Sequence, residues 1–178
     1  MAPVRAHTAD LAPAALLEIR ALLDAAFEGD FAEEDWEHAL GGVHVLLREG
    51  RDLVGHAAVV QRRLLVGGSA LRTGYVEAVA VRRERRDRGL GGALMAVAED
   101  VVRSAYELGA LSSGGRAARL YERRGWLRWE GPTWALSPDG PQRTADDDVG
   151  VFVLPTPTTP VLDLAGPIAC DWRPGDVW

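Results

Sequence analysis

The chain has 178 residues, of which 47% are hydrophobic, enough for one domain with a real core. Its 20 basic residues, all arginine, face 26 acidic ones, and the net charge of −6 disfavours general binding to nucleic acid. Because lysine is absent, every chemistry that needs a lysine is excluded, including Schiff bases and the phosphate-binding loop of NTPases. The single cysteine, Cys170, excludes an internal disulfide and a cysteine zinc cluster, and the four histidines lack metal-ligand spacing, so we expect no metal.

No targeting or membrane segment is evident. The first residues, MAPVRAHTAD, lack the apolar region of a signal peptide. No segment reaches the roughly 20 apolar residues that a membrane helix needs. We therefore expect a soluble cytoplasmic protein that binds neither membranes nor nucleic acid.

The first half of the chain predicts two helices and an antiparallel meander. Apolar residues at helical spacing follow Asp10, and Gly29 is a plausible stop. Tight turns at Gly50–Asp52 and Gly67–Ser69 join three runs rich in strand-forming residues. The predicted elements are a strand at 4–8, a helix at 11–27, an acidic helix at 32–40, and strands at 43–49, 53–65 and 70–81.

The pattern changes after Val81. A helix is predicted from Leu90 to Ala105 by its apolar spacing. It is followed by a strand at 108–112, a helix at 116–124, a strand at 126–130 and a late strand at 150–154. A strand–helix–strand order requires a parallel pair, so we predict an α/β (α+β) fold, with a mixed central sheet, an N-terminal meander and flanking helices.

The most informative motif lies where the last meander strand meets this helix. It reads RDRGLGG from Arg86 to Gly92, and five arginines lie between residues 82 and 88. Glycines at a helix start let a ligand approach the backbone, and the first-turn N–H groups favour a phosphate. A dinucleotide-binding loop would need a third glycine, and a P-loop would need a lysine. The segment could also be a solvated arginine-rich turn that has no function.

R-x-x-G-x-G in this motif resembles the pyrophosphate-binding signature of GNAT acetyltransferases. The preceding meander and the later YERRGW, from Tyr121 to Trp126, match the order of elements in that family. The resemblance implies the GNAT fold and acetyl-CoA as donor. It implies that the pyrophosphate is held by Arg86, Asp87, Arg88, Gly89, Leu90, Gly91 and Gly92. It also implies that the thioester and the pantetheine arm lie along Val79, Ala80 and Val81, admitted by a splay between this strand and the strand at 108–112.

Two side chains are candidates for proton transfer. The resemblance places Tyr121 as the general acid near the sulfur of CoA, and the alternative is a core tyrosine on an amphipathic helix. Glu77, in GYVEAVAV, is positioned to take the proton of an amine through water; the alternative is an ordinary strand carboxylate facing solvent. A carboxylate beside an ammonium favours the charged amine, so deprotonation needs a water path or desolvation.

The acceptor is predicted to be a polycation. Residues 139–178 contain seven aspartates and two arginines, a net charge of −5, whereas the motif at residues 82–88 is basic. This asymmetry suits an anionic donor and a cationic acceptor, although acidic runs are often only solvated surface.

Several segments make the resemblance narrower. GDFAEEDWEHALGG, GALSSGGRAARLYERRGW, TADDDVGVFVLP and CDWRPGDVW resemble the aminoglycoside 2'-N-acetyltransferases, a GNAT family. The resemblance implies a homodimer that acetylates the 2'-amine of aminoglycoside antibiotics and confers resistance, with Trp178 offering a terminal carboxylate. It implies substrate contacts at Asp35, Glu77, Ala78, Ser112, Asp147, Asp176 and Trp178. The chain departs from the family at Ala78, where glycine is usual, and at the glycines Gly114 and Gly115.

Two other functions stay open at this point. One is a GNAT enzyme for another amine, such as a polyamine, a cell-wall amino sugar or a peptide N-terminus. The other is a non-catalytic regulator that binds acyl-CoA, which would need neither Glu77 nor Tyr121. In each case we expect residues 1–178 to form one domain, whose acidic segment 139–178 completes the acceptor site.

Overall fold

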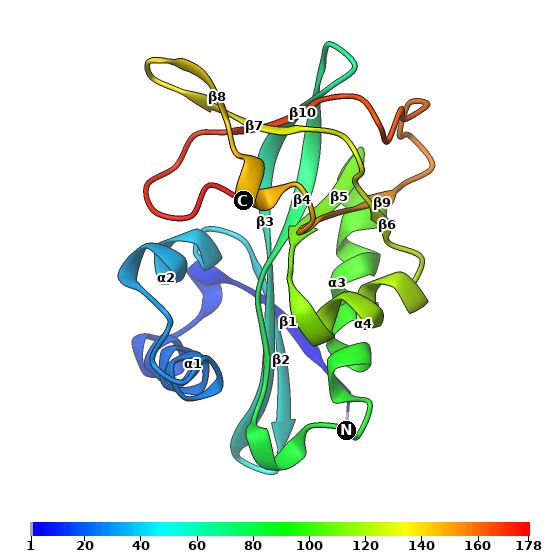
Figure 1. The fold of residues 1–178 in the computed structure, drawn as a ribbon. Helices are drawn as coiled ribbons and strands as arrows, with labels where there is room; N and C mark the ends of the chain where they lie inside the picture. The colour runs from blue at the N-terminus through cyan, green and yellow to red at the C-terminus, as the bar shows by residue number, and fades with distance from the viewer. Residues whose placement is uncertain (1) are drawn as a thin grey trace. The chain divides into compact units, whose positions relative to one another are not determined.

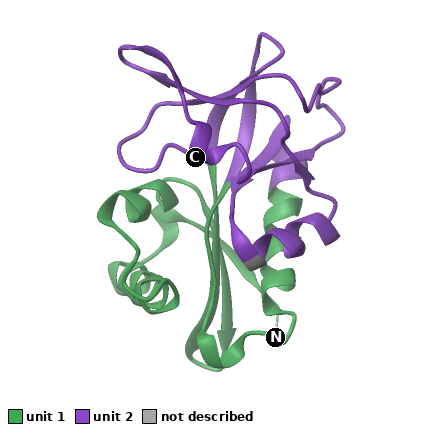
Figure 2. Ribbon diagram, viewed as in Figure 1, with its two compact units in different colours: residues 1–60, 76–101 green, residues 61–75, 102–178 purple. Residues whose placement is uncertain are grey.

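The computed structural model describes residues 2–178, apart from the side chain of Arg116. The chain forms two compact units, which Figure 2 shows in different colours. Unit 1 comprises Met1–Val60 and Val76–Val101, and unit 2 comprises Gln61–Tyr75 and Val102–Trp178. No linker separates them, because two strands and one helix continue from one unit into the other.

Unit 1 contains the meander and the helices that cover it. Its elements are β1 (Val4–His7), η1 (Thr8–Asp10), α1 (Pro13–Ala26), α2 (Glu33–Ala39), β2 (Val43–Glu49), the first part of β3 (Asp52–Val66), the second part of β4 (Ser69–Val81), η2 (Arg83–Arg85) and most of α3 (Leu90–Ala105). β1 pairs with β2 and β2 with β3, both antiparallel, and β3 is the hydrogen-bonded neighbour of β4, so the three predicted meander strands are adjacent.

The helices of unit 1 pack on both faces of its strands. α1 and α2 lie on one side and α3 on the other (Figure 1). Ile19 and Leu23 of α1, both fully buried, cluster with Leu46 of β2. On the other face a Cβ at Gly55 would lie 2.9 Å from the Leu94 side chain, so this glycine is what lets α3 approach β3.

Unit 2 contains the second half of the fold. Its own elements are β5 (Leu108–Ser112), η3 (Gly115–Ala117), α4 (Ala118–Arg123), β6 (Leu127–Arg128), β7 (Thr133–Ser137), β8 (Gly140–Arg143), η4 (Ala145–Asp147), β9 (Val151–Pro155) and β10 (Ile168–Asp171). β5 runs parallel to β4 from Thr73↔Leu108 to Tyr75↔Ala110, which confirms the predicted parallel pair. β9 and β10 lie antiparallel to β5 and β3, and β10 is parallel to β7.

The strands pair into one mixed sheet with a continuous hydrogen-bonded order. It runs β6-β9-β5-β4-β3-β10-β7-β8, with β2 also on β3 and β1 on β2. The predicted fold class, a mixed sheet with flanking helices, is therefore confirmed. No helix in the described part of the chain is long and apolar enough to cross a membrane.

Several predicted elements were wrong in extent or missed. The strand expected at 126–130 is only Leu127–Arg128, because Trp126 and Trp129 on either side turn into the core. The helix expected at 116–124 begins with a 3-10 turn and is α-helical only from Ala118. β7, β8 and β10 were not predicted, because they are five residues long or shorter and each contains or directly follows a proline.

Candidate functional site

The part of β4 that was predicted to carry the chemistry departs from regular strand geometry. Glu77, Ala78 and Val79 are all partly exposed, so the alternation of buried and exposed residues is lost there. Ala78 has φ +50°, a left-handed conformation that a non-glycine residue adopts only when its surroundings enforce it. Its carbonyl oxygen accepts a hydrogen bond from His56 Nδ1 at 2.8 Å.

The start of α3 combines first-turn N–H groups with an open glycine turn. α3 begins at Leu90, and the Ala93 N–H donates to Gly89 O at 3.1 Å. The N–H groups of the first turn have no partner within a helix. Gly89 has φ +75°, and a Cβ added there would meet no atom within 4 Å. The backbone at this point is therefore open to a ligand.

Arg86 plays a different part from the one expected of its charge alone. Its guanidinium donates to the carbonyl oxygens of Ala26, at 2.9 Å, and Val81, at 3.3 Å. These bonds tie the motif to the end of α1 and to the end of β4. Arg86 thus shapes the loop in addition to contributing positive charge to it.

Asp35 lies in the first turn of α2. Its Oδ2 accepts a hydrogen bond from the backbone N–H of Ala32 at 2.8 Å, which caps the helix. The helix has three acidic residues in its first turn, where its dipole favours negative charge. Asp35 therefore has a structural role, whatever else it contacts.

In unit 2, Tyr121 is a buried, protonated tyrosine. Its ring packs against Trp126 and Phe152, with centroids 6.2 and 6.0 Å away. Burial raises the pKa of Tyr121, and a hydrogen bond with the Ser113 side chain opposes the rise. Tyr121 therefore keeps its proton at neutral pH. Ser112 ends the neighbouring strand β5 and lies against Gly150, where an added Cβ would be 3.1 Å from Ser112 Oγ.

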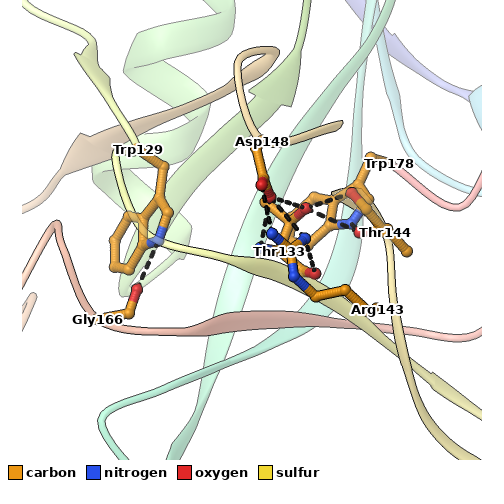
Figure 3. A network of polar contacts seen from close by, with 7 residues as sticks. All are labelled: Trp129, Thr133, Arg143, Thr144, Asp148, Gly166 and Trp178. Carbon is orange, nitrogen blue, oxygen red and sulfur yellow. Dashed lines mark hydrogen bonds and ion pairs between the residues drawn. The ribbon is translucent and has the colours of Figure 1, made fainter. Parts of the chain in front are cut away.

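A polar cluster in unit 2 joins Thr133, Arg143, Thr144 and Asp148 to Trp178 (Figure 3). The Trp178 indole donates to Thr144 Oγ1 at 2.9 Å, and Thr144 donates to Thr133 Oγ1 at 2.8 Å. Asp148 accepts from Thr133 at 2.9 Å and forms an ion pair with Arg143. The arginine and the Thr133 donors hold the pKa of Asp148 far below its usual value.

Asp147 belongs to the same cluster, but its pKa is shifted in the opposite direction from that of Asp148. Partial burial raises its pKa, and the nearby carboxylates of Asp176 and Asp146 raise it further, against a hydrogen bond from Thr144. Asp176 itself accepts from the Trp178 backbone N–H at 3.3 Å. Like charges held together in this way are a favourable site for a cation.

Comparison with known proteins decides the family. The model of the acetyltransferase (GNAT) domain matches residues 9–128. A curated aminoglycoside 2'-N-acetyltransferase from Mycolicibacterium fortuitum is 53% identical over 97% of this chain and 89% of its own length. The chain belongs to the GNAT acetyltransferase family.

Solved GNAT structures agree with this fold. A GNAT acetyltransferase from Brucella melitensis in complex with acetyl-CoA gives a TM-score of 0.61 at 17% identity, covering 97% of this chain and 96% of that one. A GCN5-related N-acetyltransferase from Kribbella flavida gives 0.58 at 21% identity and covers 73% of this chain. This chain spans only 34% of the length of the Kribbella protein.

The predicted residues of this GNAT acetyltransferase fall into two sets. Unit 1 holds Asp35, Glu77, Ala78, Val79, Ala80, Val81 and the motif from Arg86 to Gly92. Unit 2 holds Ser112, Tyr121, Asp147, Asp176 and Trp178. Within unit 2 the structure brings Asp147, Asp176 and Trp178 together, and within unit 1 it places Ala78 beside His56.

Sequence reasoning missed the polar side chains that support these sets. Thr133, Arg143 and Thr144 carry no motif, and their roles depend on pairing between β7 and β8. His44 and His56 looked scattered, yet His44 Nδ1 and His56 Nε2 are 2.9 Å apart on neighbouring strands. Only a prediction of strand register would have found the histidine pair.

Proposed function

We propose that the protein is an acetyl-CoA-dependent N-acetyltransferase that acetylates the 2'-amine of aminoglycosides. The observation that carries this proposal is the 53% identity to the Mycolicibacterium enzyme, which extends over nearly the whole of both chains. Fold similarity alone would not support a particular acceptor, because one fold hosts many activities.

The residues of unit 1 fit acetyl-CoA. The first-turn N–H groups of α3 and the open backbone at Gly89 suit a pyrophosphate, as the sequence motif implies. The loop is also basic, with five arginines between residues 82 and 88. We assign the pyrophosphate to the residues from Arg86 to Gly92, and the pantetheine arm to Val79, Ala80 and Val81. When bound, acetyl-CoA supplies an acetyl group activated as a thioester.

Three groups of the chain perform the transfer. The Val79 N–H donates to the carbonyl oxygen on which negative charge develops, the kind of interaction that lowers such barriers most. Glu77 accepts the proton of the amine through water. The Tyr121 O–H gives its proton to the departing sulfur, a role that its raised pKa and its retained proton suit.

The acceptor is bound by carboxylates. The cluster of Asp147 and Asp176 provides a place for an ammonium group, and Asp35, Ser112, Trp178 and the strand residues Glu77 and Ala78 complete the contacts that the family resemblance implies. An ammonium–carboxylate pair at about 4 Å contributes roughly 4 kcal/mol of Coulomb energy at an effective dielectric near 20, before desolvation. Polycationic aminoglycosides match this charge.

A matched panel of acceptors tests the proposal. Thiol release from acetyl-CoA is measured with aminoglycosides that bear a 2'-amine and with analogues that bear a 2'-hydroxyl. Turnover confined to the 2'-amine compounds is the expected result. Equal turnover of both would contradict the regiochemistry, and none with either, despite acetyl-CoA binding, would point to another amine, such as a polyamine, a cell-wall amino sugar or a peptide N-terminus.

The proposal includes the setting in which the enzyme works. We propose that residues 1–178 act as one domain, that the enzyme is a homodimer, and that it acts in the cytoplasm, where acetyl-CoA is available, and confers resistance. Val151 to Leu154 are buried within unit 2 and so are not available to a dimer interface. An apolar groove of about 410 Å³ on unit 2 offers another surface, lined by Leu65, Trp134, Leu136, Pro141 and Ile168, among others. Sedimentation analysis of the wild type and of Leu136→Glu would test the dimer.

A further inference from the structure

A buried chain of hydrogen bonds in unit 1 runs from η1 to β4. Thr8 Oγ1 lies 2.9 Å from His44 Nε2. His44 Nδ1 lies 2.9 Å from His56 Nε2, and His56 Nδ1 lies 2.8 Å from the carbonyl oxygen of Ala78. Both histidines are completely buried, which is unusual for a residue that is positively charged in mildly acidic solution. The fold therefore maintains two polar side chains in its interior.

The Ala78 carbonyl, at the end of this chain of hydrogen bonds, determines where each proton of the chain lies. A carbonyl oxygen only accepts, so His56 Nδ1 carries a hydrogen. Burial lowers the pKa of His56 to about 3 and that of His44 to about 4, so both rings are neutral at pH 7. A neutral His56 then accepts at Nε2, which requires a hydrogen on His44 Nδ1, and His44 Nε2 in turn accepts from Thr8. All the hydrogen bonds point from Thr8 towards Ala78.

Thr8, the first residue in this chain of hydrogen bonds, is itself held in place by the backbone. The backbone N–H of Gly41 donates to Thr8 Oγ1 at 2.9 Å, so the hydroxyl hydrogen is directed elsewhere. It has two acceptors, His44 Nε2 at 2.9 Å and Gly42 O at 3.2 Å, of which the first is the nearer. The histidine pair therefore has one arrangement of protons, set by backbone groups at both ends.

The last bond of the chain determines the direction of a backbone amide. A trans peptide is planar, so the N–H of Val79 points opposite to the C=O of Ala78. Because the Ala78 carbonyl is directed at His56, the Val79 N–H is directed away from the histidines. Ala78 is held at φ +50° in this arrangement, a conformation that would relax without a partner for its carbonyl.

We infer that His56, supported by His44 and Thr8, is a positioning residue for the Val79 N–H. The inference rests on the proposed function, in which that amide stabilises the charge on the thioester oxygen. His56 touches neither substrate. It fixes the Ala78–Val79 peptide so that the amide is already aligned when acetyl-CoA binds, and no reorganisation is needed during the reaction.

Two substitutions at one position test this inference. His56→Leu removes the donor, whereas His56→Asn keeps a side-chain N–H at nearly the place of Nδ1. We expect kcat to fall about 10- to 100-fold in His56→Leu, since one oxyanion donor is misdirected, and to recover largely in His56→Asn. The KM for acetyl-CoA should stay near the wild-type value in both variants.

A stability control separates positioning from a merely structural role. Leu23→Ala removes a fully buried side chain from the cluster against which Ala78 packs, and it removes none of the hydrogen bonds between Thr8 and Ala78. It should lower Tm and leave kcat unchanged at a temperature where the protein is folded. Wild-type kcat in His56→Leu, or the same kcat loss in Leu23→Ala, would overturn the inference.

A spectroscopic experiment tests the positioning role of His56 without any acceptor. The Val79 amide signal in ¹H–¹⁵N spectra should shift when acetyl-CoA is added to the wild type and should respond differently in His56→Leu. The ¹⁵N signals of the wild-type histidines should show hydrogen on Nδ1 in both His44 and His56. An identical Val79 response in the two proteins, or hydrogen on Nε2 of His56, would overturn the inference even if the wild type acetylated no amine. Failure of the proposed function would appear separately, in the wild-type acceptor panel.

Discussion

Tyr121 and Tyr106 are two tyrosines of unit 2 whose pKa values are both raised by burial. Of the two, we propose only Tyr121 as the general acid. We expect Tyr121→Phe to lower kcat by about 10²-fold, because the departing sulfur loses its proton donor. Acetyl-CoA binding, measured by calorimetry, should stay as in the wild type, since the phenyl ring keeps its packing against Trp126 and Phe152.

Tyr106→Phe is the matched control for that experiment. Tyr106 packs over Gly74, and an added Cβ at that glycine would lie 2.6 Å from the tyrosine ring. Removing the Tyr106 hydroxyl should leave kcat unchanged. A wild-type rate in Tyr121→Phe would show that the thiolate leaves without help and that Tyr121 is a packing residue.

Asp147 is the carboxylate of the acidic run that is best suited to bind a cation. Asp147→Asn should raise the KM for an aminoglycoside about tenfold, the effect of losing roughly 1.4 kcal/mol of binding energy, and leave the KM for acetyl-CoA unchanged. Asp139→Asn, at the exposed turn between β7 and β8, makes the same change in net charge and should alter neither constant. Equal effects of the two variants would mean that only overall charge matters.

The acidity of Asp147 adds a pH dependence. Its pKa is raised by burial and by its neighbours, so it protonates at a higher pH than an exposed aspartate. As the pH falls through that value, the carboxylate loses its charge and the aminoglycoside KM should rise in the wild type. The same pH series on Asp147→Asn should be flatter, and parallel curves would contradict the assignment.

Among elements, the parallel pair β4 and β5 depends on two glycines that lie opposite each other, Gly74 and Gly109. A Cβ at Gly109 would lie 2.9 Å from Val102 and 3.0 Å from Leu154, both in the core. We expect Gly109→Ala to lower the free energy of unfolding by about 1–3 kcal/mol, as overpacked cores usually do. Denaturant unfolding measures the change.

Gly114→Ala is the control for the strand glycine. It has a negative φ, and an added Cβ there would meet no atom within 4 Å. Its effect should lie within about 0.5 kcal/mol, the range of ordinary surface substitutions. Similar losses in both variants would show that the core around Gly109 adjusts easily.

The elements that could be predicted from sequence are those with a local signal. The meander has tight turns and strand-forming runs, and α3 has a clear apolar stripe. β10 has neither: its four residues IACD lie between β3 and β7, and both partners are remote in sequence. Trp126 and Trp129 show the same limit. Their strand-forming character predicts that both belong to the strand, whereas the burial of their rings limits the strand to the two residues between them.

For the site, the sequence suggests a role only where a motif gives a residue its context. The glycine-arginine motif and Tyr121 have such context, and their roles stay predictions. In the run Asp146–Asp148, by contrast, three identical side chains have different environments: Asp146 is exposed, Asp147 has a raised pKa, and Asp148 is paired with Arg143. The histidine pair depends on register, since His44 lies opposite Ala58 and His56 opposite Leu46, which makes them diagonal neighbours.

At the scale of the whole molecule, the two units should unfold together. β3, β4 and α3 each run through both units, so neither unit can lose these elements alone. Five of the six tryptophans lie in unit 2, and Trp36 is in unit 1. Fluorescence unfolding of Trp36→Phe therefore reports on unit 2, and it should coincide with the far-UV circular dichroism of the same protein. Separated transitions would show two independent domains.

Acid stability is the property of the whole molecule that the buried histidines control. Their pKa values in the folded protein, about 4 for His44 and about 3 for His56, lie below the ordinary 6.5. Between these values the unfolded chain binds more protons than the folded one, so the free energy of unfolding falls as the pH is lowered from 6.5 to 4. Each pKa unit corresponds to about 1.4 kcal/mol, so the pair makes this loss large.

The other groups with shifted pKa values do not produce this loss. Glu18 and Asp148 have lowered pKa values, and the stability they contribute is lost mainly as the pH falls below their ordinary values of 4.5 and 3.8. Asp147, with its raised pKa, loses repulsion in acid. Coulombic interaction with His7 is already part of what lowers the pKa of His44. Chemical denaturation at pH 6.5 and pH 4 should therefore show a larger loss for the wild type than for His44→Leu/His56→Leu. Equal losses, or NMR signals of His44 and His56 that titrate near pH 6.5 in the folded wild type, would show that the pair is open to water and that its protons are not fixed.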